Sequence, residues 1–278
     1  MPPPIPPDSE QVTDMAARVD KAYTEGEAVW GVPLHSSGGD KRTRTLLAKF
    51  VTARVGNVDE AMEMLAKTIA WRKSKRLDEP GVVDKFYESG KDDYHTICYY
   101  HGVDKDGHPV CYNRYCTLRE APVATKGTED EVERFLHWRI SAMERGIRQL
   151  DLDPDSTRPK QIMLVHDLSG AESLMTSPTL LRHLPTVMGT LNENYPEFTC
   201  RSVFINCSLL AQGVFSIINR LVSQRQRDKF VTGGSGNDAL LTFVDTAQLP
   251  ALYGGPEPPI STDGGSETEA VAAAPAAP

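Results

Sequence analysis

One apolar segment near the C-terminal end constrains this chain more than any other feature. Residues 209–222 (LLAQGVFSIINRLV) contain no proline and place apolar side chains on nearly every face of a helix. A helix that is apolar all round must be buried, or must move between burial and another apolar environment. These 14 residues are too few to span a bilayer, which takes about 20. The segment is therefore either a core helix or a lid over an apolar cavity.

The composition is that of a globular protein without an obvious charged partner. The 278 residues suit one large domain or two small ones, and a net charge of −8 argues against nucleic acid as the main partner. The five cysteines have no C-x-x-C spacing and are odd in number, which is typical of reduced thiols in a cytosolic protein. The N-terminus lacks the layout of a signal peptide. We therefore expect a cytoplasmic protein whose contact with membranes is peripheral.

The first third of the chain predicts a proline-rich arm followed by helices. Residues 1–8 are expected to be disordered or extended, and residues 9–90 to form an all-helical N-terminal domain. Apolar spacing predicts helices over 9–30, 41–55 and 58–75, with Ser9 and Asp40 as N-caps. Pro80-Gly81 and Ser89-Gly90 are interpreted as the ends of a linker.

The remainder predicts an α/β domain over residues 91–256. Strands are expected at 95–100 and 110–116, joined by a turn at 104–107. A helix at 129–150, a buried strand at 161–165 and a helix at 179–192, bent or offset at Pro185, follow. Because helices and apolar strands alternate from residue 161 onward, we expect a mixed sheet with parallel pairs. Residues 257–278 are rich in Pro, Gly, Ala and acids, which favours a disordered tail.

The sequence contains no complete catalytic or cofactor-binding motif. GGSGN at 233–237 lacks the last glycine of a nucleophile elbow, and no phosphate-binding loop occurs. The G-x-G-x-x-A pattern at 234–239 is followed too soon by Pro250 for a dinucleotide fold. His166-Asp167 could be half of a metal site or a triad, but no second ligand stands at the right spacing, so a turn histidine is favoured. We therefore expect no enzyme activity, no cofactor and no metal.

The order of motifs resembles the CRAL-TRIO family of lipid-binding domains. The C-terminal part reads NYPE at 194–197, VFIN at 203–206, the apolar segment, RQRDK at 225–229 and LPALYGG at 249–255. Earlier strings are also similar to the family: LLAKFVTAR at 46–54, NVDEA at 57–61, WR at 71–72, the hairpin GVDKDGHPV at 102–110 and HDLSG at 166–170. The resemblance spans residues 40–255. It implies a helical domain followed by an α/β lipid-binding domain whose apolar helix is a gate over a pocket for one lipid.

The resemblance also implies candidate ligand-binding residues. In the yeast phosphatidylinositol/phosphatidylcholine transfer proteins, the positions matching Arg54, Glu197 and Lys229 belong to the phosphatidylinositol headgroup site. Read without the family, these three charges could equally form surface ion pairs. Val55 and Gln226 depart from that family's headgroup pattern, and Ser208 and Ala211 depart from its gate. The residues expected to line the gate and pocket are Leu210, Val214, Phe215, Ile217, Ile218 and Leu221.

The function that follows from the resemblance is lipid carriage. We expect a monomer that binds one lipid, phosphatidylinositol or another phospholipid, and transfers or presents it between membranes. Two alternatives stay open: a lipid-sensing regulatory module without bulk transfer, and a carrier of a tocopherol, a retinoid or a sterol. An apolar cavity suits any of them, since exposing a phospholipid's roughly 30 methylenes to water costs over 20 kcal/mol at about 0.8 kcal/mol each.

Overall fold

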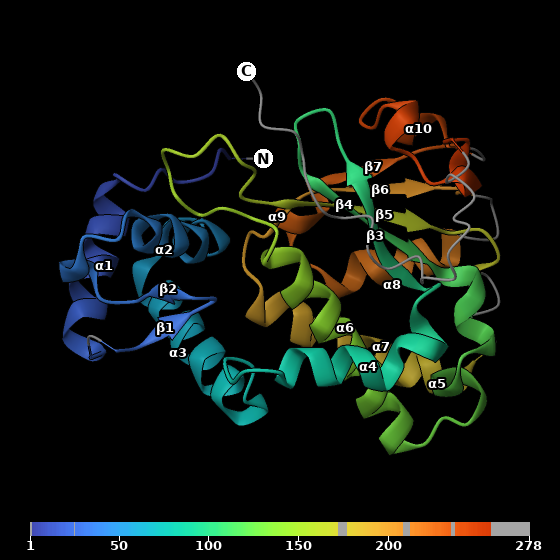
Figure 1. Cartoon of the computed structure of the whole chain (residues 1–278), viewed down its shortest axis with the longest axis horizontal. Helices are drawn as coiled ribbons and strands as arrows, with labels where there is room; N and C mark the ends of the chain where they lie inside the picture. Colours follow the sequence, from blue (N-terminus) through green and yellow to red (C-terminus); the bar gives the residue numbers. More distant parts are fainter. Residues whose placement is uncertain (1, 25, 172–176, 208–211, 235–236, 257–278) are drawn as a thin grey trace, which may run out of the picture.

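The computed structural model describes residues 2–24, 26–171, 177–207, 212–234 and 237–256. The N-terminal helices lie on one side of the molecule, and a five-stranded sheet with its covering helices lies on the other (Figure 1). The helices are α1 (Glu10–Ala22), α2 (Lys41–Ala53), α3 (Val58–Lys75), α4 (Val82–Tyr94), α5 (Pro122–Thr125), α6 (Glu129–Ile147), α7 (Pro178–Asn194), α8 (Gln212–Leu221), α9 (Gln224–Arg227) and α10 (Asp238–Leu241). The strands are β1 (Ala28–Val29), β2 (Val32–Pro33), β3 (Cys98–Val103), β4 (Pro109–Arg114), β5 (Ile162–Asp167), β6 (Thr199–Ile205) and β7 (Phe230–Thr232). Short 3-10 turns are η1 (Ser36–Gly38), η2 (Tyr115–Glu120), η4 (Thr246–Gln248) and η5 (Ala251–Tyr253).

The sheet is mixed, as the alternation of elements predicts. Its order is β3-β4-β5-β6-β7, with β3 antiparallel to β4 and the other neighbours parallel. Because side chains alternate along a strand, each central strand offers one set of residues to each face. Val110, Met163 and Val203 belong to the core on one face, which also contains Leu240 of α10 and Tyr253. Helices α4, α6, α7 and α8 lie on the opposite face (Figure 1).

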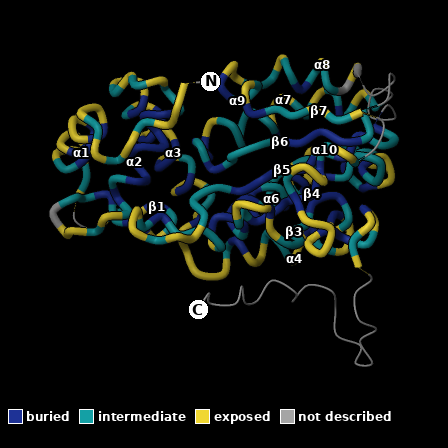
Figure 2. Tube along the Cα trace, turned by 90° about the horizontal axis from the view of Figure 1, so that it is seen from above, coloured by how far each residue is buried: buried dark blue, intermediate teal, exposed yellow. Residues whose placement is uncertain are grey.

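The N-terminal helices form where the capping residues predict them. The Ser9 side chain accepts a hydrogen bond from the Val12 amide at the start of α1, and Asp40, the other predicted cap, accepts one from the Arg42 amide at the start of α2. Helix α3 has the predicted bounds. The apolar side chains of α1, α2 and α3 share one core with Ile162 and Phe198 of the sheet domain. The two parts therefore pack through a continuous apolar core. Figure 2 shows buried chain within each part. The proposed boundary near residue 90 stays a prediction.

One helix predicted in this half is too long, and the domain is not all helix. The helix expected over 9–30 ends at Ala22, and the chain then turns through the small hairpin β1–β2. Trp30 and Gly31, with φ angles of 52° and 68°, are left-handed as a tight hairpin turn requires. The N-terminal domain is thus not purely helical.

The expected linker is helix α4. Gly90, interpreted as a breaker, lies inside this helix where it packs on α6: a Cβ there would lie 3.1 Å from Cε3 of Trp138 and 2.9 Å from Cδ2 of Tyr94. The glycine allows the two helices to approach closely. Helix α7 runs through Pro185 as one helix. No helix of the described ranges has the length and apolarity needed to cross a membrane.

Candidate functional site

A cavity of about 480 Å³ lies between the sheet and the helices that cover it. Alternate side chains of four strands face it: Cys98 and Tyr100 of β3, Cys111 and Asn113 of β4, Leu164 and His166 of β5, and Ser202 and Phe204 of β6. The helices contribute a mainly apolar wall that includes Phe135, Met143, Leu184, Met188, Ile218 and Leu221. A largely apolar concave site with a few placed polar groups is typical of small-molecule binding.

Helix α8 covers part of this cavity with one face only. Ile218 is 5% exposed and lines the cavity together with Leu221. Phe215 packs inward, with its ring 5.0 Å from that of Phe204 in an edge-to-face arrangement. Ser216 and Arg220 are exposed on the outer face. The helix is therefore amphipathic, and the expectation of apolar residues on nearly every face is too broad.

The other residues predicted for the gate either do not line the cavity or lie outside the described residues. Ile217 is half-buried and is not among the residues that line the cavity. Leu210, Ser208 and Ala211 fall outside the described residues, as does the side chain of Val214. The gating role expected of this segment stays a prediction.

The three predicted headgroup residues lie on the same cavity, at its end near α2 and α9. Arg54, Glu197 and Lys229 all line it. Glu197 is paired: Lys229 Nζ donates to its Oε2 at 3.0 Å, and Arg225 Nε donates to its Oε1 at 2.8 Å. The side chains are 8% exposed for Glu197 and Arg225 and 5% for Lys229. The pair is therefore buried, which excludes the reading of Glu197 and Lys229 as a surface ion pair.

The ion pairs keep Glu197 charged despite its surroundings. Burial alone would raise the pKa of Glu197, but the hydrogen bonds and charges of Arg225 and Lys229 outweigh burial, so that the pKa is lowered. Arg225 was not predicted as a site residue. It lies in a run of basic residues at 225–229 that reads as a solvated turn, and only its contact with Glu197 distinguishes it.

The N-terminal part of the chain supports this end of the cavity. The proline-rich arm is extended and docked: Arg225 Nη1 donates to the Pro2 carbonyl at 3.0 Å, and the Ile5 amide donates to Thr52 Oγ1 at 2.9 Å. Lys49 of α2 is buried, and its Nζ donates to the Glu197 carbonyl at 3.1 Å. Burial lowers the pKa of Lys49 to about 7. Lys49 of α2 thus holds the backbone of Glu197, while Arg225 and Lys229 near the end of the chain hold its side chain.

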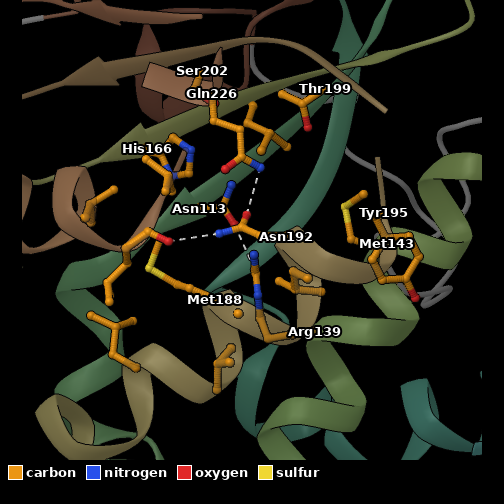
Figure 3. A pocket seen from close by; sticks show the side chains of 18 of the residues that line it. Asn113, Arg139, Met143, His166, Met188, Asn192, Tyr195, Thr199, Ser202 and Gln226 are labelled. Carbon is orange, nitrogen blue, oxygen red and sulfur yellow. Dashed lines mark hydrogen bonds between the residues drawn. The ribbon is translucent and has the colours of Figure 1, made fainter. Parts of the chain in front are cut away.

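A second polar cluster lies deeper along the cavity wall (Figure 3). Arg139 Nη1 of α6 donates to Asn113 Oδ1 at 2.7 Å, and Asn113 Nδ2 donates to the Val165 carbonyl at 3.1 Å. The thiols of Cys98 and Cys111 face Arg139, with their sulfur atoms 3.5 Å apart. Within the described residues no carboxylate pairs with Arg139. The guanidinium is therefore a cation on the cavity wall whose neighbours are an amide and two thiols in place of a carboxylate.

Sequence reasoning missed Arg139, although a signal exists. It lies four residues before Met143 and three after Leu136, at the edge of the apolar stripe predicted for that helix. A charged side chain at the edge of an apolar stripe is rarely buried without a partner. It therefore points either to solvent or into a cavity.

His166 and Asp167 do not form a joint site. His166 faces the cavity and its Nδ1 lies 2.9 Å from the hydroxyl of Tyr115. Burial, followed by the charge of Arg139, lowers the pKa of His166 to about 3, so the ring is neutral. Asp167 belongs to the other face, where Tyr253 donates to its Oδ2 at 2.8 Å and Asn206 to its Oδ1 at 2.7 Å.

Gln226, which departs from the family's headgroup pattern, has a structural contact instead. Its Nε2 donates to Asn192 Oδ1 at 3.0 Å, and Asn192 Nδ2 donates to the Leu221 carbonyl at 3.3 Å (Figure 3). The side chain of Gln226 therefore connects α9, through α7, to the last residue of α8.

These features define the class: α/β proteins in which a mixed sheet and the helices on one of its faces enclose an apolar cavity. The chain belongs to the CRAL/TRIO domain family, whose model matches residues 93–255. The predicted family and fold class are confirmed.

The chain is also similar to several individual proteins. Patellin-4 of Arabidopsis thaliana is 35% identical over 251 residues, which cover 90% of this chain and 44% of Patellin-4. Patellin-6 of the same plant is 30% identical, over 94% of this chain and 62% of its own. The phosphatidylinositol transfer protein SFH5 of Cryptococcus neoformans is 29% identical, over 82% of this chain and 79% of its own. The chain thus spans less than two thirds of these two Patellins.

A solved structure shares the fold. The crystal structure of Sfh5 superposes with a TM-score of 0.66 at 19% identity, and the match covers 90% of this chain and 88% of that one.

Proposed function

We propose that this chain binds a single lipid in the cavity and transfers or presents it between membranes. The observation that carries the proposal is the mainly apolar cavity of about 480 Å³ beneath α8, with its charged groups gathered in two clusters. Such a cavity can keep acyl chains out of water, at about 0.8 kcal/mol for each buried methylene. Membership of the CRAL/TRIO family and similarity to a protein named as a phosphatidylinositol transfer protein support it.

We further propose phosphatidylinositol as the ligand, with its headgroup at Arg54, Glu197 and Lys229. Lysine and arginine bind phosphate oxygens, and a carboxylate accepts hydrogen bonds from inositol hydroxyls. Lys229 and Arg225 each donate a hydrogen bond to Glu197, so a headgroup that binds Glu197 would share or replace these bonds. We propose that the protein acts as a monomeric carrier, without catalysis, at the surface of membranes.

A vesicle assay tests the proposal. Labelled phosphatidylinositol, phosphatidylcholine, sterol and tocopherol are offered in donor vesicles, and transfer to acceptor vesicles is followed with and without protein. Leu184→Trp should slow transfer because the indole fills the cavity that Leu184 lines. Leu252→Trp is the matched control, since Leu252 is 57% exposed and lies off the cavity. Transfer at the protein-free rate for all four lipids would show that the carrier proposal is wrong.

A binding measurement beside the transfer assay distinguishes a lipid carrier from a lipid sensor. A sensor would bind a lipid without moving it. Native mass spectrometry of the protein mixed with each vesicle type reports binding, and the transfer rate reports carriage. Binding with no transfer would favour the sensing role.

A further inference from the structure

Three side chains with metal-binding atoms meet at the amino ends of β4 and β6, away from the lipid cavity. Asp104 and His108 come from the β3–β4 turn, and Cys200 is the second residue of β6. One ligand atom from each lies within 4.8 Å of the other two. None of the three lines the cavity. His108 and Cys200 are 92 positions apart in the sequence. Only the pairing of strands in the sheet brings them together.

The carboxylate of this cluster is held in place by the turn. Asp104 Oδ1 accepts hydrogen bonds from the backbone amides of Asp106 at 3.0 Å and His108 at 2.8 Å. Gly107, with φ of 85°, allows the tight turn that points both amides at this oxygen. The Asp104 side chain is 1% exposed. Its position is therefore fixed before any ion arrives.

The imidazole and the thiol complete the set. His108 Nδ1 lies 3.0 Å from Asp104 Oδ2, and the ring is 20% exposed, which gives an ion a route from solvent. Cys200 is half-buried, and its thiol donates a long hydrogen bond of 3.4 Å to the Ile162 carbonyl. Among the described residues, the other side-chain hydrogen bonds of His108 and Cys200 lie within the cluster itself, so metal binding would replace few contacts outside it.

We propose that Asp104, His108 and Cys200 bind one divalent ion of the zinc class. Imidazole nitrogen, thiolate sulfur and carboxylate oxygen are the ligands that zinc takes in proteins, and three protein ligands leave a fourth position for water. With bonds of about 2.0–2.3 Å to a tetrahedral ion, the ligand atoms would lie roughly 3.3–3.8 Å apart. His108 Nδ1 lies 3.0 Å from Asp104 Oδ2, and no two of the three ligand atoms are more than 4.8 Å apart. Small side-chain rotations suffice.

Bound in this way, the ion would tie the β3–β4 turn to the start of β6 across β5. Strand β6 follows directly from the segment that carries Glu197, so the ion would also restrain the backbone that leads from the charged end of the cavity. Because an ion that binds only the folded chain stabilises it, zinc should raise the melting temperature.

Protons compete with the ion for this site. Zinc takes cysteine as the thiolate and histidine as the neutral imidazole, so binding should release protons and tighten as pH rises.

Cobalt titration of the full chain, with thiols kept reduced, tests the proposal. Co²⁺ is the probe because a thiolate ligand gives it a charge-transfer band in the near ultraviolet. We expect one equivalent to bind with that band, and Zn²⁺ to displace it. Cys200→Ser should abolish the band, and His108→Gln should weaken binding by at least about tenfold. Cys207→Ser is the matched control, since this thiol is also half-buried but outside the cluster.

The outcomes are decisive in both directions. No cobalt uptake by the unmodified protein at 100-fold excess would overturn the site without recourse to any variant, as would an unchanged charge-transfer band in Cys200→Ser. A rise in melting temperature with Zn²⁺ that is lost in Cys200→Ser and kept in Cys207→Ser would support it.

Discussion

Lys229 Nζ lies 3.0 Å from Glu197 Oε2, and both side chains are buried, with exposures of 5% and 8%. Arg225 contacts the other oxygen of the same carboxylate. One carboxylate thus pairs with two buried cations at the charged end of the cavity, which leaves this trio with a net charge of +1. Removing Glu197 leaves two buried cations without a counter-charge, whereas removing Lys229 leaves Glu197 paired with Arg225. The two substitutions should therefore change the stability of the protein by different amounts.

The first prediction concerns the acid. Glu197→Gln should destabilise the protein by about 3–5 kcal/mol, because it leaves Arg225 and Lys229 buried without a counter-charge. The free energy of unfolding in urea at pH 7 measures this. Since the pKa of Glu197 is lowered on folding, its stabilising contribution is present above the unfolded pKa and is lost as pH falls through the folded one. Asp155→Asn, in an exposed pair with Lys41, is the control and should change nothing measurable. Equal effects would contradict a buried charge cluster.

The second prediction concerns ligand choice at Lys229. Lys229→Met should lower phosphatidylinositol transfer roughly tenfold to a hundredfold, because a charge-assisted phosphate contact is worth about 1.5–3 kcal/mol. Phosphatidylcholine transfer should barely change. Lys85→Met, at an exposed lysine off the cavity, controls for net charge. Equal losses for both lipids would point to damage of the fold and would count against a headgroup role.

The third prediction concerns α8. Phe215 packs inward on Phe204, so Phe215→Asp would place a charge in the core beneath the helix and would report unfolding as much as membrane contact. Phe215→Ala is the better probe. It should lower the free energy that holds α8 on the sheet by about 1–3 kcal/mol, which is less than the cost of removing a fully buried aromatic ring. Hydrogen exchange should speed up over 212–221 while amides of β5 stay protected. Unchanged exchange in α8 would show that Phe215 does not hold this helix down.

The fourth prediction is a pH dependence from Lys49. Its pKa is about 7 in the folded protein and near 10.4 when unfolded, so the unfolded state binds more protons between these values. Stability due to Lys49 therefore rises with pH over this window. His108, whose pKa is raised to about 10, opposes it, because its contribution is lost as pH rises. The difference between the unmodified protein and Lys49→Met isolates the lysine. That difference should shift in favour of the unmodified protein from pH 7 to 10, and a constant difference would refute the shift.

The fifth prediction concerns Arg139, the cavity-facing cation. Arg139 pairs with no carboxylate among the described residues, so Arg139→Met leaves no uncompensated acid behind. It does remove the donor to Asn113 Oδ1, so the free energy of unfolding should fall by no more than about 1–3 kcal/mol. It should also weaken the binding of an acidic lipid such as oleate more than that of its methyl ester. Arg145→Met, on the same helix but stacked on Tyr87, is the matched control. Equal effects of Arg139→Met on the acid and the ester would show that the guanidinium does not meet the ligand's charge.

Local sequence determined the elements whose signals are local. Helix α3 has the predicted bounds, because its cap and its apolar stripe lie within one segment. The order of the sequence motifs identified the family by resemblance, and the alternation of helices and apolar strands predicted the mixed sheet, since parallel strands need a crossover connection. The apolar segment at 209–222 indicated a helix over an apolar space. By contrast, Gly90 reads as a breaker in sequence, and only the approach of α4 to α6 shows why it lies within a helix.

Tertiary structure alone decided which charged and polar side chains meet. Arg225 reaches Glu197 from 28 residues away and Pro2 from 223 residues away, and Cys200 meets His108 across the sheet. Periodicity reports which face of an element is apolar, but it carries no information about the partner that a polar group finds there. That choice depends on the strand order and on the helices packed above it. Arg139 shows the limit most clearly: the same residue on the same helix would be an ordinary surface charge if no cavity lay beside it.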